Sequence, residues 1–390
     1  MGVIFQNHNN VYEIDIHKIY MFKIKYALLV FFTFVIGFSI GSEELPFDDT
    51  IQNFIKKSDK DMTKYETIDP IFYETNVDSI INIKNSNDVK KIRDNLQQFI
   101  WKESYFSFER MPSYTDSNFI DERYSNLSNL EKIDKLTTIM EYDVSSTAYL
   151  FLPIEKNYKL VIYHAGHEGD FFNAKETIEF FLNNNYAVLT FSMPLYGQNN
   201  NPIIEHENFG ILKMTSHDYF YFIDSENFSS IKFFVEPILT SINYSLAKYE
   251  FDSIHMVGLS GGAWTTTLYA AIDERINKSF PVGGPLPTYL RVDGNLGHYE
   301  QINPELYDIA NYLELYVLGS FGDNREQIKI VNKYDSCCHY GITFQTFEEN
   351  LINLMNNLGS GSFRVFLDDT HMEHKISEKA LEIILQYMNK

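Results

Sequence analysis

Cysteine is scarce in this sequence, and its scarcity excludes one class of protein. The 390 residues include only Cys337 and Cys338, which are adjacent. A small disulfide-stabilised domain needs several cysteines spread along the chain, so a disulfide framework is excluded. A bond between the two neighbours is an alternative, but it would be strained, and we expect a pair of small buried residues instead.

Basic residues are also in short supply. The chain has 32 Lys and Arg against 53 Asp and Glu, for a formal net charge of −21. Nucleic-acid binding requires a basic patch, and the sequence contains none, so we predict no nucleic-acid partner. Internal repeats are absent as well, which argues against a propeller attached to a peptidase.

One long apolar run without charge is present, at residues 26–40. It is short for a membrane span and typical of the core of a signal peptide. Basic residues precede it, at Lys18, Lys23 and Lys25. We therefore predict that residues 1–41 direct the chain into the secretory pathway, to a secreted or lumenal location.

The polar segment before this run leaves an alternative open. Ser39 and Gly41 place small residues before a possible cleavage site, and a start at Met21 would give an ordinary signal peptide. A start at Met1 favours an uncleaved membrane anchor instead. Four Asn-x-Ser sequons fit a secreted glycoprotein, although an asparagine-rich chain produces some by chance: Asn126, Asn227, Asn243 and Asn277.

The most informative stretch begins at Ile254. Apolar residues from Ile254 to Val257 indicate a short buried strand, residues 258–262 read Gly-Leu-Ser-Gly-Gly, and apolar residues then recur at helical spacing to Ala271. A strand, a Gly-x-Ser-x-Gly turn and a helix form the layout of a nucleophile elbow. The glycines leave room for a sharp turn, and the helix N-terminus favours negative charge near Ser260. The alternative is a glycine-rich turn with a surface serine.

From about residue 135 predicted strands alternate with helices, which indicates an α/β fold with a mostly parallel sheet flanked by helices. The strands are expected at 135–142, 147–152, 159–164, 186–191, 254–257, 278–282, 328–332 and 363–367. The helices are expected at 171–182, within 216–249, up to about 273, at 343–357 and after Ser377. Functional groups in such folds lie in the loops after the strands.

These patterns predict that the chain is divided into three parts. After residues 1–41 comes an N-terminal extension at 42–134, partly helical and packed on the core, and then a catalytic domain at 135–390. A lid-like insertion is expected at about 285–315, where the alternation breaks. Its tyrosines could line a pocket, but ordinary aromatic core is the simpler interpretation.

A serine nucleophile needs a base, usually histidine, and a carboxylate that orients the base. Downstream of Ser260, Asp335 follows one predicted strand and His374 follows the last. His371 is an alternative base, and Asp323 is an alternative acid. We favour His374 because it comes just before the final helix, and Asp335 because Asp323 precedes its strand.

With the elbow, the order Ser260, Asp335, His374 makes residues 135–390 resemble the α/β-hydrolases of the esterase and lipase type. The resemblance implies that Ser260 attacks an acyl carbon, that His374 carries the proton and that Asp335 holds the imidazole. It implies a small-molecule or lipid-like ester as substrate and no cofactor. A peptidase of the same fold and a non-catalytic binding module are the alternatives.

The segment from His164 to Gly169 resembles the His-Gly motif that completes the oxyanion hole in these hydrolases, with Ala165 as a departure. We assign the two donors to the backbone of Gly261 and to His167. Metal binding by His164 and His167 is an alternative. A zinc site needs a third ligand, and the sequence shows none at a convincing spacing, so we predict no metal.

Overall fold

The computed structural model describes residues 2–7, 10–15, 62–167, 169–291 and 296–390. The chain divides into two compact units, Met1–Met62 and Thr63–Lys390. In the first, β1 (Gly2–Asn7) and β2 (Asn10–Asp15) pair as an antiparallel hairpin. The predicted apolar run at 26–40 lies outside the described residues. Among those that are described, no helix is both long and apolar enough to cross a membrane.

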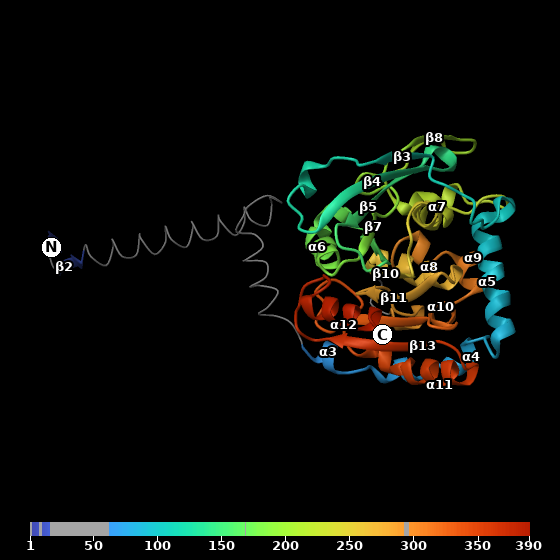
Figure 1. Ribbon diagram of the computed structural model, residues 1–390. Coiled ribbons are helices and arrows are strands. Elements are labelled where there is room, and N and C mark those ends of the chain that lie inside the picture. Colours follow the sequence, from blue (N-terminus) through green and yellow to red (C-terminus); the bar gives the residue numbers. More distant parts are fainter. Residues whose placement is uncertain (1, 8–9, 16–61, 168, 292–295) are drawn as a thin grey trace. The chain divides into compact units, whose positions relative to one another are not determined.

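A nine-stranded sheet forms the centre of the second unit (Figure 1). Its order is β13-β12-β11-β10-β6-β7-β5-β4-β3; the strands from β13 to β7 are parallel, and β5, β4 and β3 are added antiparallel. The strands are β3 (Tyr114–Ser117), β4 (Leu130–Ile139), β5 (Ser145–Pro153), β6 (Lys159–His164), β7 (Ala187–Phe191), β10 (Ser253–Leu259), β11 (Ile276–Val282), β12 (Glu326–Asn332) and β13 (Ser362–Asp368).

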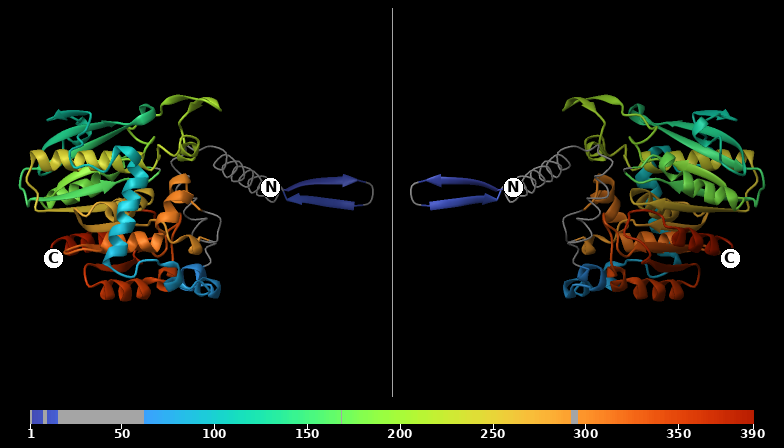
Figure 2. Two further views of the ribbon diagram at one scale, coloured as in Figure 1. Left: turned by 90° about the vertical axis from the view of Figure 1, so that its right-hand side faces the viewer. Right: turned by 90° about the vertical axis from the view of Figure 1, so that its left-hand side faces the viewer.

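Helices cover both faces of this sheet (Figures 1 and 2). One face packs on α6 (Lys175–Asn183) and α12 (Glu378–Met388), and the other on α5 (Ser86–Trp101), α7 (Lys232–Lys248), α8 (Gly261–Ile272), α10 (Tyr312–Ser320) and α11 (Glu348–Leu358). Strand β6 shows why its sequence is apolar throughout. Leu160 and Ile162 join one core, and Val161 and Tyr163 join the other.

The remaining helices are short. They are α3 (Thr63–Glu66), α4 (Val77–Ile80) and α9 (Pro304–Ile309), together with the 3₁₀ turns η1 (Pro70–Tyr73), η2 (Lys102–Ser104), η3 (Glu122–Tyr124), η4 (Glu141–Asp143), η5 (Phe171–Ala174), η6 (His217–Phe222), η7 (Thr288–Leu290), η8 (Tyr299–Gln301) and η9 (Thr343–Thr346). The predicted cap of the last helix is confirmed, because Ser377 Oγ accepts a hydrogen bond of 2.9 Å from Ala380 N.

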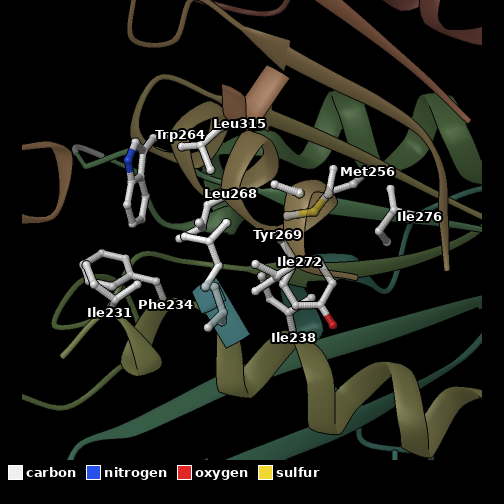
Figure 3. Close-up of a cluster of buried hydrophobic side chains, with 14 of the residues drawn as sticks. Ile231, Phe234, Ile238, Met256, Trp264, Leu268, Tyr269, Ile272, Ile276 and Leu315 are labelled. Atoms are coloured by element: carbon white, nitrogen blue, oxygen red, sulfur yellow. The ribbon is translucent and has the colours of Figure 1, made fainter. Parts of the chain in front are cut away.

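Helix α8 lies at the centre of the larger core, and every one of its residues is buried. Figure 3 shows Trp264, Leu268, Tyr269 and Ile272 of this helix among side chains from α7, α10, β10 and β11. The indole N–H of Trp264 has a hydrogen-bond partner within this core, since Nε1 donates to Tyr307 Oη at 2.8 Å. The burial holds α8, and the turn before it, in one position.

The structure differs from the predicted elements in three places. Residues 285–315 are not all insertion, because α10 begins at Tyr312 and is the buried helix that connects β11 to β12. An exposed hairpin, β8 (Ile203–His206) with β9 (Gly210–Lys213), follows β7, and the edge strand β3 lies within the extension, where no strand was predicted. The expectation of buried cysteines is wrong: Cys337 is exposed and Cys338 is half-buried.

A buried cation attaches helix α5, which precedes the sheet in the chain, to helices that cover the sheet. Arg93 of α5 is 5% exposed and donates hydrogen bonds of 2.9 Å to Ala271 O of α8 and to Leu318 O of α10. Its third nitrogen contacts Glu274 Oε1 at 2.6 Å. One side chain therefore joins three helices.

We predict that Arg93→Met lowers the free energy of unfolding by about 2 kcal/mol, because the buried Ala271 O loses its side-chain donor and Leu318 O keeps only that of Arg325. Urea denaturation followed by circular dichroism measures this change. Lys91→Met, at an exposed position of the same helix, is the control and should change stability by less than about 0.5 kcal/mol. Equal losses in the two variants would contradict this account of α5.

Candidate active site

Ser260 occupies the sharp turn between β10 and α8. Its backbone angles, φ 58° and ψ −118°, lie in a region that residues with a side chain rarely adopt. Ser260 N donates to Val282 O at 3.0 Å, which ties the turn to the end of β11. The predicted strand, turn and helix are all present at this position.

The glycines around Ser260 are required by close packing. A Cβ on Gly258 would lie 2.1 Å from Gly262 O, and a Cβ on Gly262 would lie 2.1 Å from His164 O. Real Cβ atoms do not approach oxygens so closely. The backbone of the turn therefore presses against its own helix and against the end of β6, and this leaves no room for larger residues.

Asp335 and His374 are brought together by the loops after β12 and β13. His374 Nδ1 donates to Asp335 Oδ2 at 2.7 Å, and the Asp335 side chain is fully buried. Asp335 Oδ1 accepts from the backbone N–H of Cys337 at 2.8 Å and of Cys338 at 3.4 Å. These contacts fix the carboxylate and direct the second imidazole nitrogen, Nε2, away from it.

The turn after β11 lies between this pair and Ser260. Gly283 has φ 54°, and a Cβ on it would lie 3.4 Å from His374 Cε1 and 3.5 Å from Asp335 Oδ2. A Cβ on Gly284 would lie 3.4 Å from Ser260 O. The Gly-Gly turn thus contacts the pair on one side and the elbow on the other, at the carboxyl edge of the sheet.

The two alternative residues have other partners. His371 Nε2 lies 3.3 Å from Asp368 Oδ2. Burial would raise the pKa of Asp368, but hydrogen bonds from His371, Ser377 and Thr370 outweigh it and hold that pKa well below its usual range. Asp323 accepts a hydrogen bond of 2.9 Å from Ser360 at an exposed turn. The structure pairs His374 with Asp335 and places neither alternative between them.

The loop after β6 packs on the elbow. A Cβ on Gly166 would lie 2.9 Å from Ser260 Cβ, and a Cβ on Gly261 would lie 2.4 Å from His167 Nδ1. His167 Nε2 lies 2.7 Å from Glu300 Oε1. Because the ring already has this partner, the main-chain N–H groups at 166–167 are the candidate source of an oxyanion donor. Burial lowers the pKa of His164 to about 4, and this ring is a neutral packing residue.

A cavity of about 730 Å³ opens beside the Asp335 loop. Its wall includes Cys337 and Cys338, Leu286 and Arg291, and also the segment from Lys64 to Phe72. That segment is attached by Lys333, whose Nζ lies 2.8 Å from Glu66 Oε1. No sequence signal predicts that residues 64–72 line this cavity, because a cavity wall made of short turns has no periodic pattern.

Lys329 is buried behind the Gly-Gly turn. Its Nζ donates to Gly284 O at 3.2 Å and to Pro285 O at 2.9 Å. Burial, with a smaller effect of the Arg291 charge, lowers the pKa of Lys329 to about 7. An unfolded chain keeps this proton to about pH 10.4, so between pH 7 and pH 10 the unfolded state binds more protons than the folded state.

We therefore predict that the Lys329 contribution to stability rises with pH by about 2 kcal/mol between pH 7 and pH 9. Urea denaturation at the two pH values, in wild type and in Lys329→Met, isolates this contribution as the difference in slope. Lys91→Met should keep the wild-type slope. A Lys329→Met slope equal to that of wild type would show that Lys329 stays protonated in the folded chain.

Comparison with known proteins adds information at the level of fold. No protein-family model and no curated protein sequence matches this chain. Among solved structures, a methylesterase aligns with TM-score 0.55 and 12% identity over 80% of this chain and 65% of its own. Acetyl xylan esterases from a Paenibacillus and a Thermoanaerobacterium species both give TM-score 0.52, at 13% and 14% identity.

These two alignments cover 84% and 83% of this chain and 98% of each esterase. Likeness at such low identity establishes the arrangement of the backbone. The mostly parallel sheet, the helices on both faces and the neighbours agree with the fold predicted from the elbow. The chain has the α/β-hydrolase fold.

Proposed function

We propose that this protein is a serine hydrolase that cleaves carboxylic ester bonds through Ser260, His374 and Asp335. The observation that carries the proposal is the hydrogen bond between His374 and the buried Asp335, a pair that meets the strained Ser260 turn across the Gly283-Gly284 turn. Strain at one serine and a histidine–carboxylate pair at the same sheet edge are independent features. Together they support a triad in which the pair activates the serine hydroxyl.

The reaction follows from the positions of these groups. Ser260 Oγ attacks the acyl carbon while His374 Nε2 takes the hydroxyl proton, and Asp335 stabilises the imidazolium that forms. The N–H groups of Gly261 and His167 stabilise the oxyanion. His374 then protonates the departing alkoxide. Water, deprotonated by His374, attacks the acyl-enzyme, and release of the acid restores Ser260.

The substrate is expected to be a small ester. The cavity beside the Asp335 loop is of a size typical for small ligands, and polar residues such as Lys64, Asp69 and Arg291 line it together with Leu286 and Leu290. A mixed lining suits a short acyl or polar alcohol group better than a long lipid chain. The two acetyl xylan esterases with the same fold support ester hydrolysis as the reaction class.

The secretory location also belongs to the proposal. It rests on the apolar run at 26–40 and on sequons at exposed positions, Asn126 and Asn227. Asn243 is 4% exposed and donates to Ser107 O and Arg110 O, so this sequon is closed to a glycan in the folded chain.

Ser260→Ala should abolish labelling by a fluorophosphonate probe and lower the hydrolysis rate of p-nitrophenyl acetate by several orders of magnitude, because the residues act as a unit. Gel fluorescence and absorbance assays measure the two effects. Ser279→Ala, at a buried serine on β11, is the control and should be labelled normally. A folded wild-type chain that resists the probe would favour a binding module instead.

His374→Ala should also abolish turnover, whereas His371→Ala should keep most of it. Only His374 contacts Asp335, and a base must reach the serine while its other nitrogen faces the carboxylate. Rates with p-nitrophenyl acetate and thermal unfolding of both variants test this. An inactive, folded His371→Ala beside an active His374→Ala would reverse the assignment of the base without affecting that of Ser260.

A further inference from the structure

A second group of reactive side chains includes a residue of the loop after β6. It consists of His167, His217, His298 and Glu300, which we call the His-Glu cluster. Each residue offers one ligand atom, and these atoms all lie within 4.8 Å of one another. They come from three segments: the loop after β6, the turn η6, and the residues around η8.

Glu300 is at the centre of the cluster. Its carboxylate is fully buried, with Oε1 at 2.7 Å from His167 Nε2 and Oε2 at 3.2 Å from His217 Nδ1. The His298 ring packs on the His167 ring at a centroid distance of 4.3 Å and lies 5.6 Å from that of His217. Three imidazoles therefore surround one carboxylate inside the protein.

The tautomer of His217 indicates that a cation or a proton is needed between His217 and Glu300. His217 Nε2 lies 2.7 Å from Pro194 O, which can only accept, so Nε2 carries the proton. In the neutral ring Nδ1 then presents a lone pair toward Glu300 Oε2, which is also an acceptor. Two acceptors at 3.2 Å repel unless a cation or a proton lies between them.

Other atoms of the cluster lack hydrogen bonds as well. Within the described part of the chain, His217 Nδ1, His298 Nδ1 and Glu300 Oε2 are buried and have no hydrogen-bond partner. A buried polar atom without a partner costs about 1–3 kcal/mol. A single ligand that accepts lone pairs from all three would explain why these buried atoms have no hydrogen-bond partner.

We propose that His167, His217, His298 and Glu300 bind a Zn²⁺ ion. Three imidazole nitrogens and one carboxylate oxygen are donors that zinc prefers, and four protein ligands match its tetrahedral coordination. Mg²⁺ and Ca²⁺ prefer sites made of oxygen ligands. The hydrogen bond from His217 Nε2 to Pro194 O is the outer contact that typically fixes the tautomer of a metal-bound histidine.

The ion would have a positioning role. His167 belongs to the loop that packs on the elbow, and its ring lies against Gly261. A bond from the ion to this ring would add a further link between that loop, η6 and the residues around η8, which already contact one another through Tyr299 N and Asp218 and through His167 and Glu300.

The test measures metal and not activity, so its outcome is independent of the proposed ester hydrolysis. Purified full-length protein is stripped with a chelator, incubated with zinc sulfate and passed through gel filtration, and its zinc is measured by mass spectrometry. We expect about one zinc per chain, a lower melting temperature in the stripped protein and recovery of that temperature with zinc.

The variant His298→Ala should retain less than a tenth of the wild-type zinc and lose the response of its melting temperature. His206→Ala is the matched control, because His206 is also half-buried but bonds to Phe222 O outside the cluster. Cobalt substitution of the wild type, which does not depend on a variant folding, should give the visible absorption of tetrahedral Co²⁺. Absence of retained zinc, or undiminished zinc in His298→Ala, would overturn the proposal.

Discussion

The arrangement of this site depends on holding Ser260 in a backbone conformation that it would not adopt alone. A residue at φ 58° returns to a common conformation unless its surroundings prevent it. Here the hydrogen bond to Val282 O restrains the turn on one side, and the burial of the whole of α8 restrains it on the other. The hydrophobic packing of the larger core therefore offsets the free-energy cost of this strained conformation.

The same packing determines the charge of the polar groups near the edge of the sheet. His164 and Lys329 are buried without a counter-ion, so their neutral forms are favoured, and both act by hydrogen bonding to main-chain carbonyls. Asp335 is buried but satisfied by two N–H groups and an imidazole. Burial thus distinguishes the two groups that hydrogen-bond to main-chain carbonyls from Asp335, which is satisfied by N–H groups and by His374.

The sequence predicted the parallel strands and the elbow from local pattern, and chain order led it to propose Asp335 and His374, which the structure places in contact. A strand covered on both faces is apolar throughout, and loops after parallel strands meet at one edge. It could not predict β3 and the β8–β9 hairpin, whose residues are mostly exposed. Helix α10 is apolar on all sides and so has no helical period. The His-Glu cluster was missed since its members are far apart in sequence.

The segment from Lys64 to Phe72 has a consequence for how the chain folds. It forms a wall of the cavity and contacts the Asp335 loop through Tyr334 and Glu66, which are separated by 268 residues along the chain. Contacts across such a separation are entropically costly and form late. During synthesis residues 64–72 leave the ribosome early, and they cannot form these contacts until β12 and the loop after it have also been synthesised. This cavity is consequently among the last features to be completed, after the core around α8 has been built.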